Sequence, residues 1–226
     1  RMLIVNSPSN PTGWVISTDE QRALMEIADE HGLVILADEV YERLVFDAQQ
    51  HVAPSFARLD APRARLIVTN SFSKTYNMTG WRLGWAQTSE GTIKAISKAV
   101  EFMTSNPAAM VQQAGIIALR DGEACLAELR AHYRARRDQV REALAAIPGV
   151  RLPQPDGAFF ALPRISGMTD STAFTAELVR NTGVALAPGV AFGAAGEGFV
   201  RLCFASTEAT LAEALVRLQR FMAQSR

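Results

Sequence analysis

The sequence is poor in the residues that cross-link proteins or bind metals. Its 226 residues include only two cysteines, Cys125 and Cys203, and three histidines. Neither cysteine lies in a Cys-x-x-Cys motif, which argues against a disulfide framework and against a cysteine-ligated zinc site. The histidines stand far apart in the chain, without the spacing of metal ligands (His31, His51 and His132). We therefore predict no metal site.

The sequence also lacks an excess of charge and a long apolar run. Lysine and arginine total 23, and aspartate and glutamate total 23, so the net charge favours neither a nucleic acid nor an anionic membrane as partner. No apolar run approaches the roughly 18 residues of a membrane span. The apolar start gives way to a polar loop at Asn6, too soon for a signal peptide. We expect a cytoplasmic protein and, because position 1 is not methionine, a piece of a longer chain.

The first 90 residues have the pattern of an open α/β sheet. A helix is predicted to start at Ser17, which fits a capping box with Glu20. Thr18 with Gln21 fits the same pattern, and Gly32 is a natural stop. Strand, helix and strand in so short a stretch predict parallel pairing with a right-handed crossover. The predicted strands are four short, mainly apolar runs, at residues 2–5, 33–37, 66–69 and 82–86.

The remainder of the chain changes character. Residues 91–120 are predicted to form a connecting helix, interrupted at Asn106-Pro107 because a residue before proline disfavours helix. A long amphipathic helix follows over residues 122–147. Short strands at 157–163, 184–187 and 199–204, with helices at 171–181 and 207–222, then predict a smaller α+β domain over residues 121–226.

An arginine-rich run spans Arg130 to Arg141 within the long helix. A nucleic-acid surface is one interpretation of such a run. The arginines alternate with the apolar stripe of the helix, however, and the chain as a whole is neutral. We therefore interpret them as the solvated positions of that helix.

Polar and ionisable residues follow the predicted strands, where an open parallel sheet binds its ligands. Taken singly, each has a structural explanation as a turn, a cap or a surface cation. Together they bring a lysine, an acid, a phenol, hydroxyls and a guanidinium to one sheet edge, which suits an anionic, electrophilic cofactor. In strand order the groups are Asn10 to Gly13, Asp38 to Tyr41, Ser71 to Lys74, and Arg82 at the start of the fourth strand.

Two competing motifs are incomplete. Ser71-x-x-Lys74 matches the Ser-x-x-Lys of serine β-lactamases, but the Ser-Asp-Asn and Lys-Thr-Gly partners of that motif are missing. The glycines between Gly193 and Gly198 have the wrong order for a dinucleotide-binding loop and lie outside the predicted βαβ unit.

The motifs instead resemble those of the class I/II aminotransferases, which are fold-type I pyridoxal-phosphate enzymes. The resemblance runs from Leu3 to the last predicted helix, with the motifs in the family's order and spacing. It implies that residues 1–90 are the C-terminal part of the cofactor-binding large domain. The matching segments are Asn10-Pro-Thr-Gly13, Ala37-Asp-Glu-Val-Tyr41, Ser71-Phe-Ser-Lys74, Thr79-Gly-Trp-Arg82-Leu-Gly84, Pro188-Gly-x-x-Phe192-Gly193 and Phe199-Val-Arg201.

The resemblance assigns a role to each polar residue of these motifs. Lys74 would form the Schiff base with the aldehyde of pyridoxal phosphate and later carry the proton. Asp38 would pair with the pyridine nitrogen so that the ring accepts electrons. Arg201 would hold the substrate α-carboxylate in a bidentate grip. Tyr41 and Asn10 would contact the phenolic oxygen of the cofactor, and Asn10 would also lie near the substrate. The phosphate would be bound by Ser71, Ser73 and Arg82.

The resemblance also implies an amino acid and a 2-oxo acid as substrates and a homodimer that shares its active sites. The family's large domain begins well before Leu3, so we expect this chain alone to expose apolar surface and to bind the cofactor weakly. In the dicarboxylate-specific subgroup an arginine lies four residues before Ser105-Asn106-Pro107, where this chain has Glu101. That departure puts this mode of binding an acidic substrate in doubt.

Two alternatives share this scaffold. One is lyase chemistry with the same cofactor, because the residues around the lysine hardly separate the reactions. The other is the aminotransferase-like effector domain of a transcription regulator, which would carry a DNA-binding helix-turn-helix upstream.

Overall fold

The computed structural model describes residues 1–47, 49–60 and 65–224, and it divides into two compact units. Unit 1 comprises Arg1–Ser9 and Trp14–Arg130, and unit 2 comprises Asn10–Gly13 and Ala131–Arg226. The division along the chain lies inside helix α5 (Glu123–Ala145). Residues 225 and 226, the end of the predicted second domain, lie outside the described residues.

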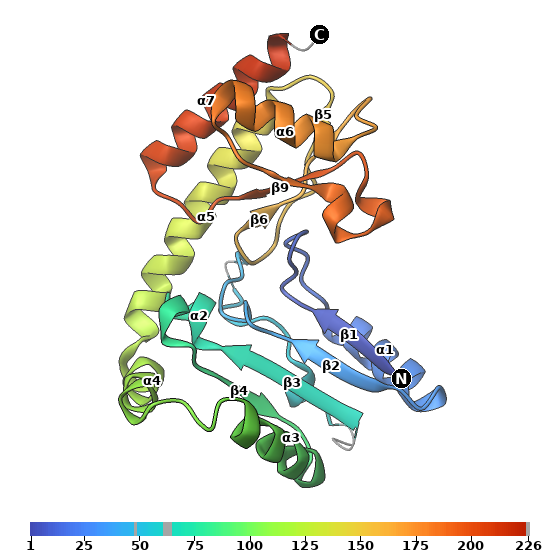
Figure 1. The fold of residues 1–226 in the computed structure, drawn as a ribbon, viewed down its shortest axis with the longest axis vertical. Coiled ribbons are helices and arrows are strands. Elements are labelled where there is room, and N and C mark those ends of the chain that lie inside the picture. Colours follow the sequence, from blue (N-terminus) through green and yellow to red (C-terminus); the bar gives the residue numbers. More distant parts are fainter. Residues whose placement is uncertain (48, 61–64, 225–226) are drawn as a thin grey trace. The chain divides into compact units, whose positions relative to one another are not determined.

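Unit 1 is built on a four-stranded sheet in the order β1-β2-β3-β4 (Figure 1). The first three strands pair in parallel and β4 runs antiparallel to β3. The prediction of a mostly parallel α/β sheet is therefore confirmed, with its last strand reversed. The strands are β1 (Met2–Asn6), β2 (Val34–Asp38), β3 (Leu66–Ser71) and β4 (Gly84–Gln87).

Helix α1 (Thr18–Glu30) covers one face of this sheet through Met25 and Ala28. Ser17 caps it as predicted, because the Ser17 hydroxyl accepts from the Glu20 N–H while Glu20 binds the Ser17 N–H. The alternative box at Thr18 and Gln21 does not form, because Ser17 is the N-cap and the side-chain amide of Gln21 makes no hydrogen bond to any described residue. The core beneath the helix is apolar and includes Ile16, Ile35, Ala37, Phe56, Leu66 and Val68.

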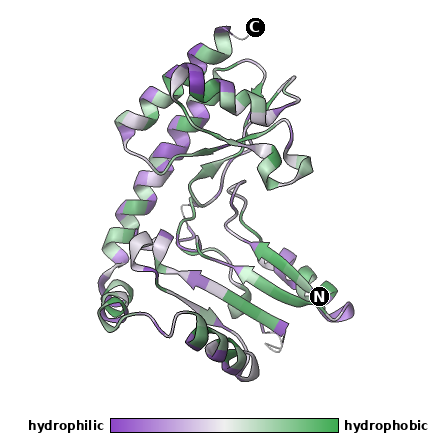
Figure 2. Ribbon diagram, viewed as in Figure 1, coloured by the Kyte–Doolittle hydropathy of each residue, from purple (hydrophilic) through white to green (hydrophobic). Residues whose placement is uncertain are grey.

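Three further α-helices precede α5 in the described part of unit 1, and two of them expose apolar side chains. The short helix α2 (Phe72–Thr75) follows β3, and α3 (Glu90–Met103) and α4 (Ala109–Asp121) flank the predicted break at Asn106-Pro107. No residue of α3 is buried. Figure 2 shows the sheet strands largely in green, as expected of a core. The exposed apolar side chains of α3 and α4 include Phe102, Met103, Met110, Ile116, Ile117 and Leu119.

The arginines of α5 correct our sequence interpretation. Arg130, Arg136 and Arg137 are each only 8% exposed, whereas we predicted solvated positions. Arg130 pairs with Glu123 and Arg137 with Asp138, both on α5 itself. An arginine can bury its long stem and still pair its guanidinium with an acid, which a count of charge alone does not reveal. Arg141 is exposed as predicted.

In the described residues, unit 2 holds two small antiparallel sheets, the end of α5 and two further α-helices. Two short 3₁₀ helices also belong to it, at Gly189–Phe192 and Ala194–Gly196. One sheet pairs β5 (Val150–Arg151) with β7 (Arg164–Ile165), and the other has the order β6-β9-β8. Those strands are β6 (Phe160–Ala161), β8 (Ala187–Pro188) and β9 (Val200–Cys203). The prediction of a strand at 184–187 is wrong except at Ala187, because β8 is only two residues long.

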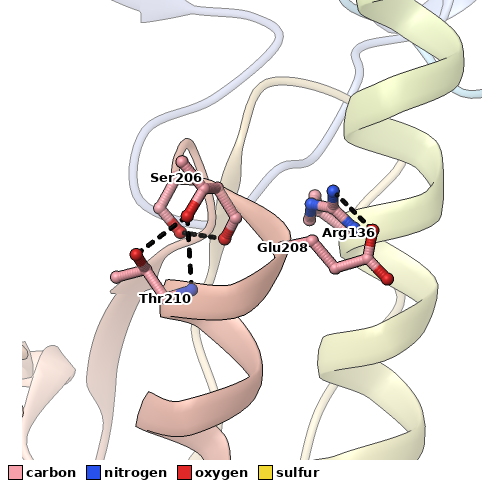
Figure 3. A network of polar contacts seen from close by, with 5 residues as sticks. Arg136, Ser206, Glu208 and Thr210 are labelled. Atoms are coloured by element: carbon pink, nitrogen blue, oxygen red, sulfur yellow. Dashed lines mark hydrogen bonds and ion pairs between the residues drawn. The ribbon is translucent and has the colours of Figure 1, made fainter.

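Helices α6 (Ser171–Thr182) and α7 (Glu208–Gln224) lie close to the predicted bounds. The start of α7 is tied to α5 by an ion pair between Arg136 and Glu208 at 3.2 Å (Figure 3). Beside it, the Thr207 hydroxyl accepts from the Thr210 N–H at 3.2 Å and donates to the Thr210 hydroxyl. Within the described residues, none of the helices combines the length and the apolar character that crossing a membrane requires.

Candidate active site

The first set of predicted site residues lies in unit 1, at the edge where its parallel strands end. The register pairs Asn6 with Asp38 and Asp38 with Thr69, so the ends of β1, β2 and β3 share this edge. Helix α2 follows the end of β3 (Figure 1). The sheet therefore brings the segments that contain Asp38 and Lys74 to one side.

Arg82 reaches the same edge because of the direction of β4. Antiparallel pairing places Gly84 opposite Ser71, so the residues before β4 lie where β3 ends. In a parallel strand, Arg82 would lie at the opposite edge. The sequence motif indicated Arg82, but the strand direction that places it depends on pairing with β3.

Asp38 ends β2 and is half-buried. Its backbone carbonyl accepts from the Asn6 side-chain amide at 3.0 Å and from the Ser7 N–H at 3.1 Å. Its carboxylate accepts a long hydrogen bond of 3.4 Å from the Val40 N–H. Burial raises the pKa of Asp38, and the Val40 N–H offsets that shift only in part. A cation beside the carboxylate would restore the ionised form.

The segment after Asp38 is held by Glu39, which our sequence analysis did not select. Glu39 is 2% exposed, and its carboxylate accepts from the Phe56 N–H at 2.9 Å. Its own N–H donates to the Thr69 carbonyl at 2.9 Å. Burial raises the pKa of Glu39 to about 7. These contacts fasten the turn that contains Tyr41, which is 4% exposed.

Lys74 is the third residue of α2 and is half-buried. Ser71 caps this helix, since its hydroxyl accepts from the Ser73 N–H at 3.1 Å and donates to the Leu83 carbonyl at 3.3 Å. The Phe72 ring lies 5.1 Å from the Trp85 ring, between centroids, and anchors the helix to β4. The four-residue helix therefore has a defined position despite its length.

Arg82 and Ser73 complete the set in unit 1. Ser73 is buried, whereas Arg82 is exposed. The backbone of Arg82 is in the left-handed region at φ 52°, which costs a non-glycine residue energy and is common at functional sites. Its guanidinium donates to the Thr79 carbonyl at 2.9 Å.

The second set of predicted residues lies in unit 2, where Asn10 meets Arg201. The Arg201 guanidinium donates to the Asn10 side-chain carbonyl at 3.0 Å, across 191 residues of sequence. Its central carbon lies 4.8 Å from the Phe160 ring centroid and 5.0 Å from that of Phe192. Two aromatic faces thus hold the guanidinium by cation–π contact. We did not predict the contact with Phe160 from the sequence.

The loop Asn10–Gly13 belongs to unit 2 because Gly13 is anchored there. The Gly13 carbonyl accepts from the N–H groups of Asp156 and Gly157, each at 2.9 Å. A Cβ at Gly13 would stand 2.6 Å from the Pro155 Cβ, and φ is +74°, so only glycine fits. This anchor keeps Asn10 beside Arg201.

Comparison with known proteins assigns the chain to a family. The family model for aminotransferase class I and II matches residues 1–218. The chain belongs to this family. Its members depend on pyridoxal phosphate.

Individual relatives agree with that assignment. The chain is 36% identical over 223 residues to an aspartate aminotransferase of Pyrococcus horikoshii, covering 97% of this chain and 56% of the relative. It is 39% identical to an asparagine–oxo-acid transaminase of Streptococcus mutans, covering 98% and 57% respectively. The crystal structure of an aromatic aminotransferase from P. horikoshii superposes with a TM-score of 0.93 at 36% identity, covering 100% of this chain and 60% of that one. The chain thus spans little more than half the length of these relatives.

Proposed function

We propose that the protein containing this chain is an aminotransferase that moves an amino group between an amino acid and a 2-oxo acid. The observation that carries the proposal is the placement of Lys74. Its capped helix lies at the sheet edge that also holds Asp38 and Arg82, in a chain of the aminotransferase family. Cytoplasmic location and assembly as a homodimer belong to the same proposal, and the apolar side chains exposed on α3 and α4 support the homodimer.

Pyridoxal phosphate is the proposed cofactor. When bound, it supplies an aldehyde that condenses with amines and a ring that accepts electrons. Lys74 provides the amine that holds the aldehyde and later carries a proton to and from the substrate Cα. The Asp38 carboxylate would pair with the ring nitrogen and keep it protonated. That positive charge would in turn lower the pKa of Asp38, which burial raises.

The other predicted contacts fit the anionic groups of this cofactor. Tyr41 is buried and follows Asp38 by three residues in the sequence. Its hydroxyl and the Asn10 amide would hydrogen-bond the phenolic oxygen of the cofactor. The Ser71 hydroxyl, Ser73 and the exposed Arg82 would bind the phosphate, for which a planar guanidinium is suited.

Arg201 is the proposed binding site for the substrate α-carboxylate. Its guanidinium is fixed by the Asn10 carbonyl and by two aromatic rings, so little side-chain entropy remains to be lost on binding. A fixed bidentate grip orients the Cα–H bond for proton removal. Relatives are named for aspartate, asparagine and aromatic amino acids. Glu101 stands where the dicarboxylate-specific subgroup has an arginine, which argues against an acidic side chain bound in that way.

The proposal extends to the domains of such an enzyme, although the two compact units divide at residue 130 rather than at 90 or 120. We propose that the sheet of unit 1, within residues 1–90, is the C-terminal part of the cofactor-binding domain. Residues 91–120, observed as α3 and α4, connect it to the smaller domain at 121–226.

The test is an assay on the protein expressed from its complete reading frame. We expect a keto acid and a new amino acid to form together when an amino donor and a 2-oxo acid are supplied. Lys74→Ala should abolish turnover, whereas Lys94→Ala should not, because Lys94 is exposed and pairs with Glu90 on α3. Ammonia release without an acceptor would instead assign lyase chemistry, and no cofactor-dependent reaction would favour an effector domain.

A second measurement addresses this chain by itself. Residues 1–226 titrated with pyridoxal phosphate should show weak absorbance changes, because the chain spans only about 57% of its relatives. A stable cofactor band abolished by Lys74→Ala would contradict this expectation and would show that the two units suffice for binding.

A further inference from the structure

Two arginines of unit 2 lie directly opposite each other without an acid between them. Arg151 of β5 is the antiparallel partner of Arg164 of β7. Both are exposed, and neither forms an ion pair with any carboxylate in the described part of the chain. Opposite positions of a strand pair hold side chains about 5 Å apart, and like charges there repel. The pair therefore concentrates positive charge at one place.

Both arginines line the same cavity, which we call the Arg151–Arg164 cavity. Its volume is about 450 Å³, and the rest of its lining is Ile165, the loop at residues 166–169, Glu197 and Gly198. Gly167 and Gly198 have φ values of +81° and +86°, which side-chain-bearing residues rarely adopt. A Cβ at Gly167 would meet no atom within 4 Å, so the space around this part of the lining is open.

The acidic residue in this lining, Glu197, is already engaged elsewhere. Its carboxylate accepts from the Ser171 N–H at 2.7 Å, the Ser171 hydroxyl at 3.2 Å and the Gly198 N–H at 3.0 Å. The neighbouring Asp170 is likewise engaged, because it accepts from the Ala173 N–H at 2.8 Å as the cap of α6. Both acids bind backbone N–H groups at the start of α6 rather than the arginines.

We propose that the Arg151–Arg164 cavity binds a phosphate group, either the free ion or the phosphate of a small metabolite. Two guanidinium forks match the charge and the oxygen geometry of a dianion. Arg164 is partly oriented by the Phe199 ring, whose centroid lies 5.9 Å from its central carbon. A bound dianion converts the repulsion between the arginines into attraction. The site is independent of the proposed aminotransferase function, since it uses none of the predicted active-site residues.

The first test is calorimetric titration with inorganic phosphate at low, matched ionic strength. Arg82→Gln serves as the background, so that the candidate active site does not contribute phosphate binding. We expect saturable binding that Arg151→Gln and Arg164→Gln each weaken at least tenfold. Arg180→Gln, which removes an exposed arginine of α6 outside the lining, should leave binding unchanged. No saturable binding, or an equal loss in Arg180→Gln, would overturn the proposal.

A second arm replaces phosphate with glycerol 3-phosphate and with acetate. Tighter binding of the phosphomonoester would assign the cavity to a phosphorylated metabolite, and equal binding would assign it to the free ion. Acetate carries one charge and should bind more weakly than either. Acetate binding as strong as phosphate binding would contradict recognition of a dianion.

The third test uses stability, which needs no cofactor. Without phosphate, Arg151→Gln should raise the melting temperature because it relieves the repulsion. Phosphate should raise the melting temperature of the parent protein by mass action but not that of the variant. A variant that is less stable without phosphate, yet equally stabilised by it, would show that the pair is not the site.

Discussion

At the scale of single residues, the most unusual group is the buried carboxyl of Glu39. It lies next to Asp38 in sequence and ties the end of β2 to Phe56 through a 2.9 Å hydrogen bond. Burial raises its pKa from 4.5 to about 7, so the folded protein binds a proton there that the unfolded chain releases. The contribution of this raised pKa to the free energy of unfolding is therefore complete below pH 4.5, and it declines as the pH rises toward 7.

Glu39→Gln should remove that pH dependence while keeping an acceptor for the Phe56 N–H. The shift from 4.5 to about 7 corresponds to about 3 kcal/mol of unfolding free energy lost between acidic and neutral pH. The free energy of unfolding, measured with urea, should differ less between pH 5 and pH 8 in the variant than in the parent. Glu30→Gln, at the exposed end of α1, is the control and should leave the difference unchanged. Equal pH dependence in the parent and Glu39→Gln would refute the assignment.

Arg201 offers the second residue-scale prediction. Arg201→Lys keeps the charge but loses the planar fork held by Asn10 and the two rings. We expect kcat/KM for transamination to fall about 100-fold, or roughly 3 kcal/mol of transition-state stabilisation. The matched control Arg180→Lys should have no effect. Steady-state kinetics in which Arg201→Lys retains full kcat/KM would exclude Arg201 as the carboxylate site.

At the scale of elements, helix α4 packs closely against the helix that carries Lys74. Gly115 of α4 is buried, and a Cβ there would stand 2.5 Å from the Leu83 Cδ2 and 3.2 Å from the Phe72 Cζ. Phe72 begins α2, so the absence of a side chain at Gly115 lets α4 support that helix. The position of Lys74 therefore depends on a glycine 41 positions later in the sequence.

Gly115→Ala and Gly91→Ala should have opposite effects on stability. At Gly115 the added methyl overpacks the contact with Leu83 and Phe72, and we expect a loss of about 1–2 kcal/mol. At Gly91 in α3 no atom lies within 4 Å of the added Cβ, and alanine should gain up to about 1 kcal/mol through helix propensity. Denaturant unfolding measures both variants. A gain at Gly115 equal to that at Gly91 would show that α4 does not press on α2.

Elements also show what the sequence allowed us to predict. Strand β2 and helix α1 follow from local patterns, an apolar run and the Ser17–Glu20 box, so their existence was predictable. The reversed direction of β4 depends on pairing with β3, and the burial of Arg130 depends on packing, so neither is encoded locally. The motifs suggested Lys74 and Asp38 as site residues, whereas Glu39 and Phe160 required the three-dimensional contacts.

At the scale of the whole molecule, the exposed apolar side chains of α3 and α4 are unusual for a surface. Phe102 and Met103 are 82% and 80% exposed, and several further apolar residues of α4 are more than half exposed. Such clusters usually mark interaction surfaces. They support the proposed homodimer of the complete protein and predict association of this chain when it is produced alone.

Phe102→Glu should weaken that association, because a buried unpaired charge is costly at an interface. Analytical ultracentrifugation of residues 1–226 should show concentration-dependent oligomers that this variant shifts toward monomer. Val179→Glu places the same charge on a 42% exposed valine of α6 and should leave the distribution unchanged. A monomeric parent chain at all concentrations would contradict the prediction.

The central claim is that Lys74 is the residue that holds pyridoxal phosphate, and chemical trapping tests it most directly. The protein from the complete reading frame would be loaded with the cofactor, reduced with borohydride, digested and mapped by mass spectrometry. This chain contains three lysines, Lys74, Lys94 and Lys98. We predict that the phosphopyridoxyl group is found on Lys74, in the peptide following Arg65. Label on Lys94 or Lys98 with Lys74 unmodified would contradict the account.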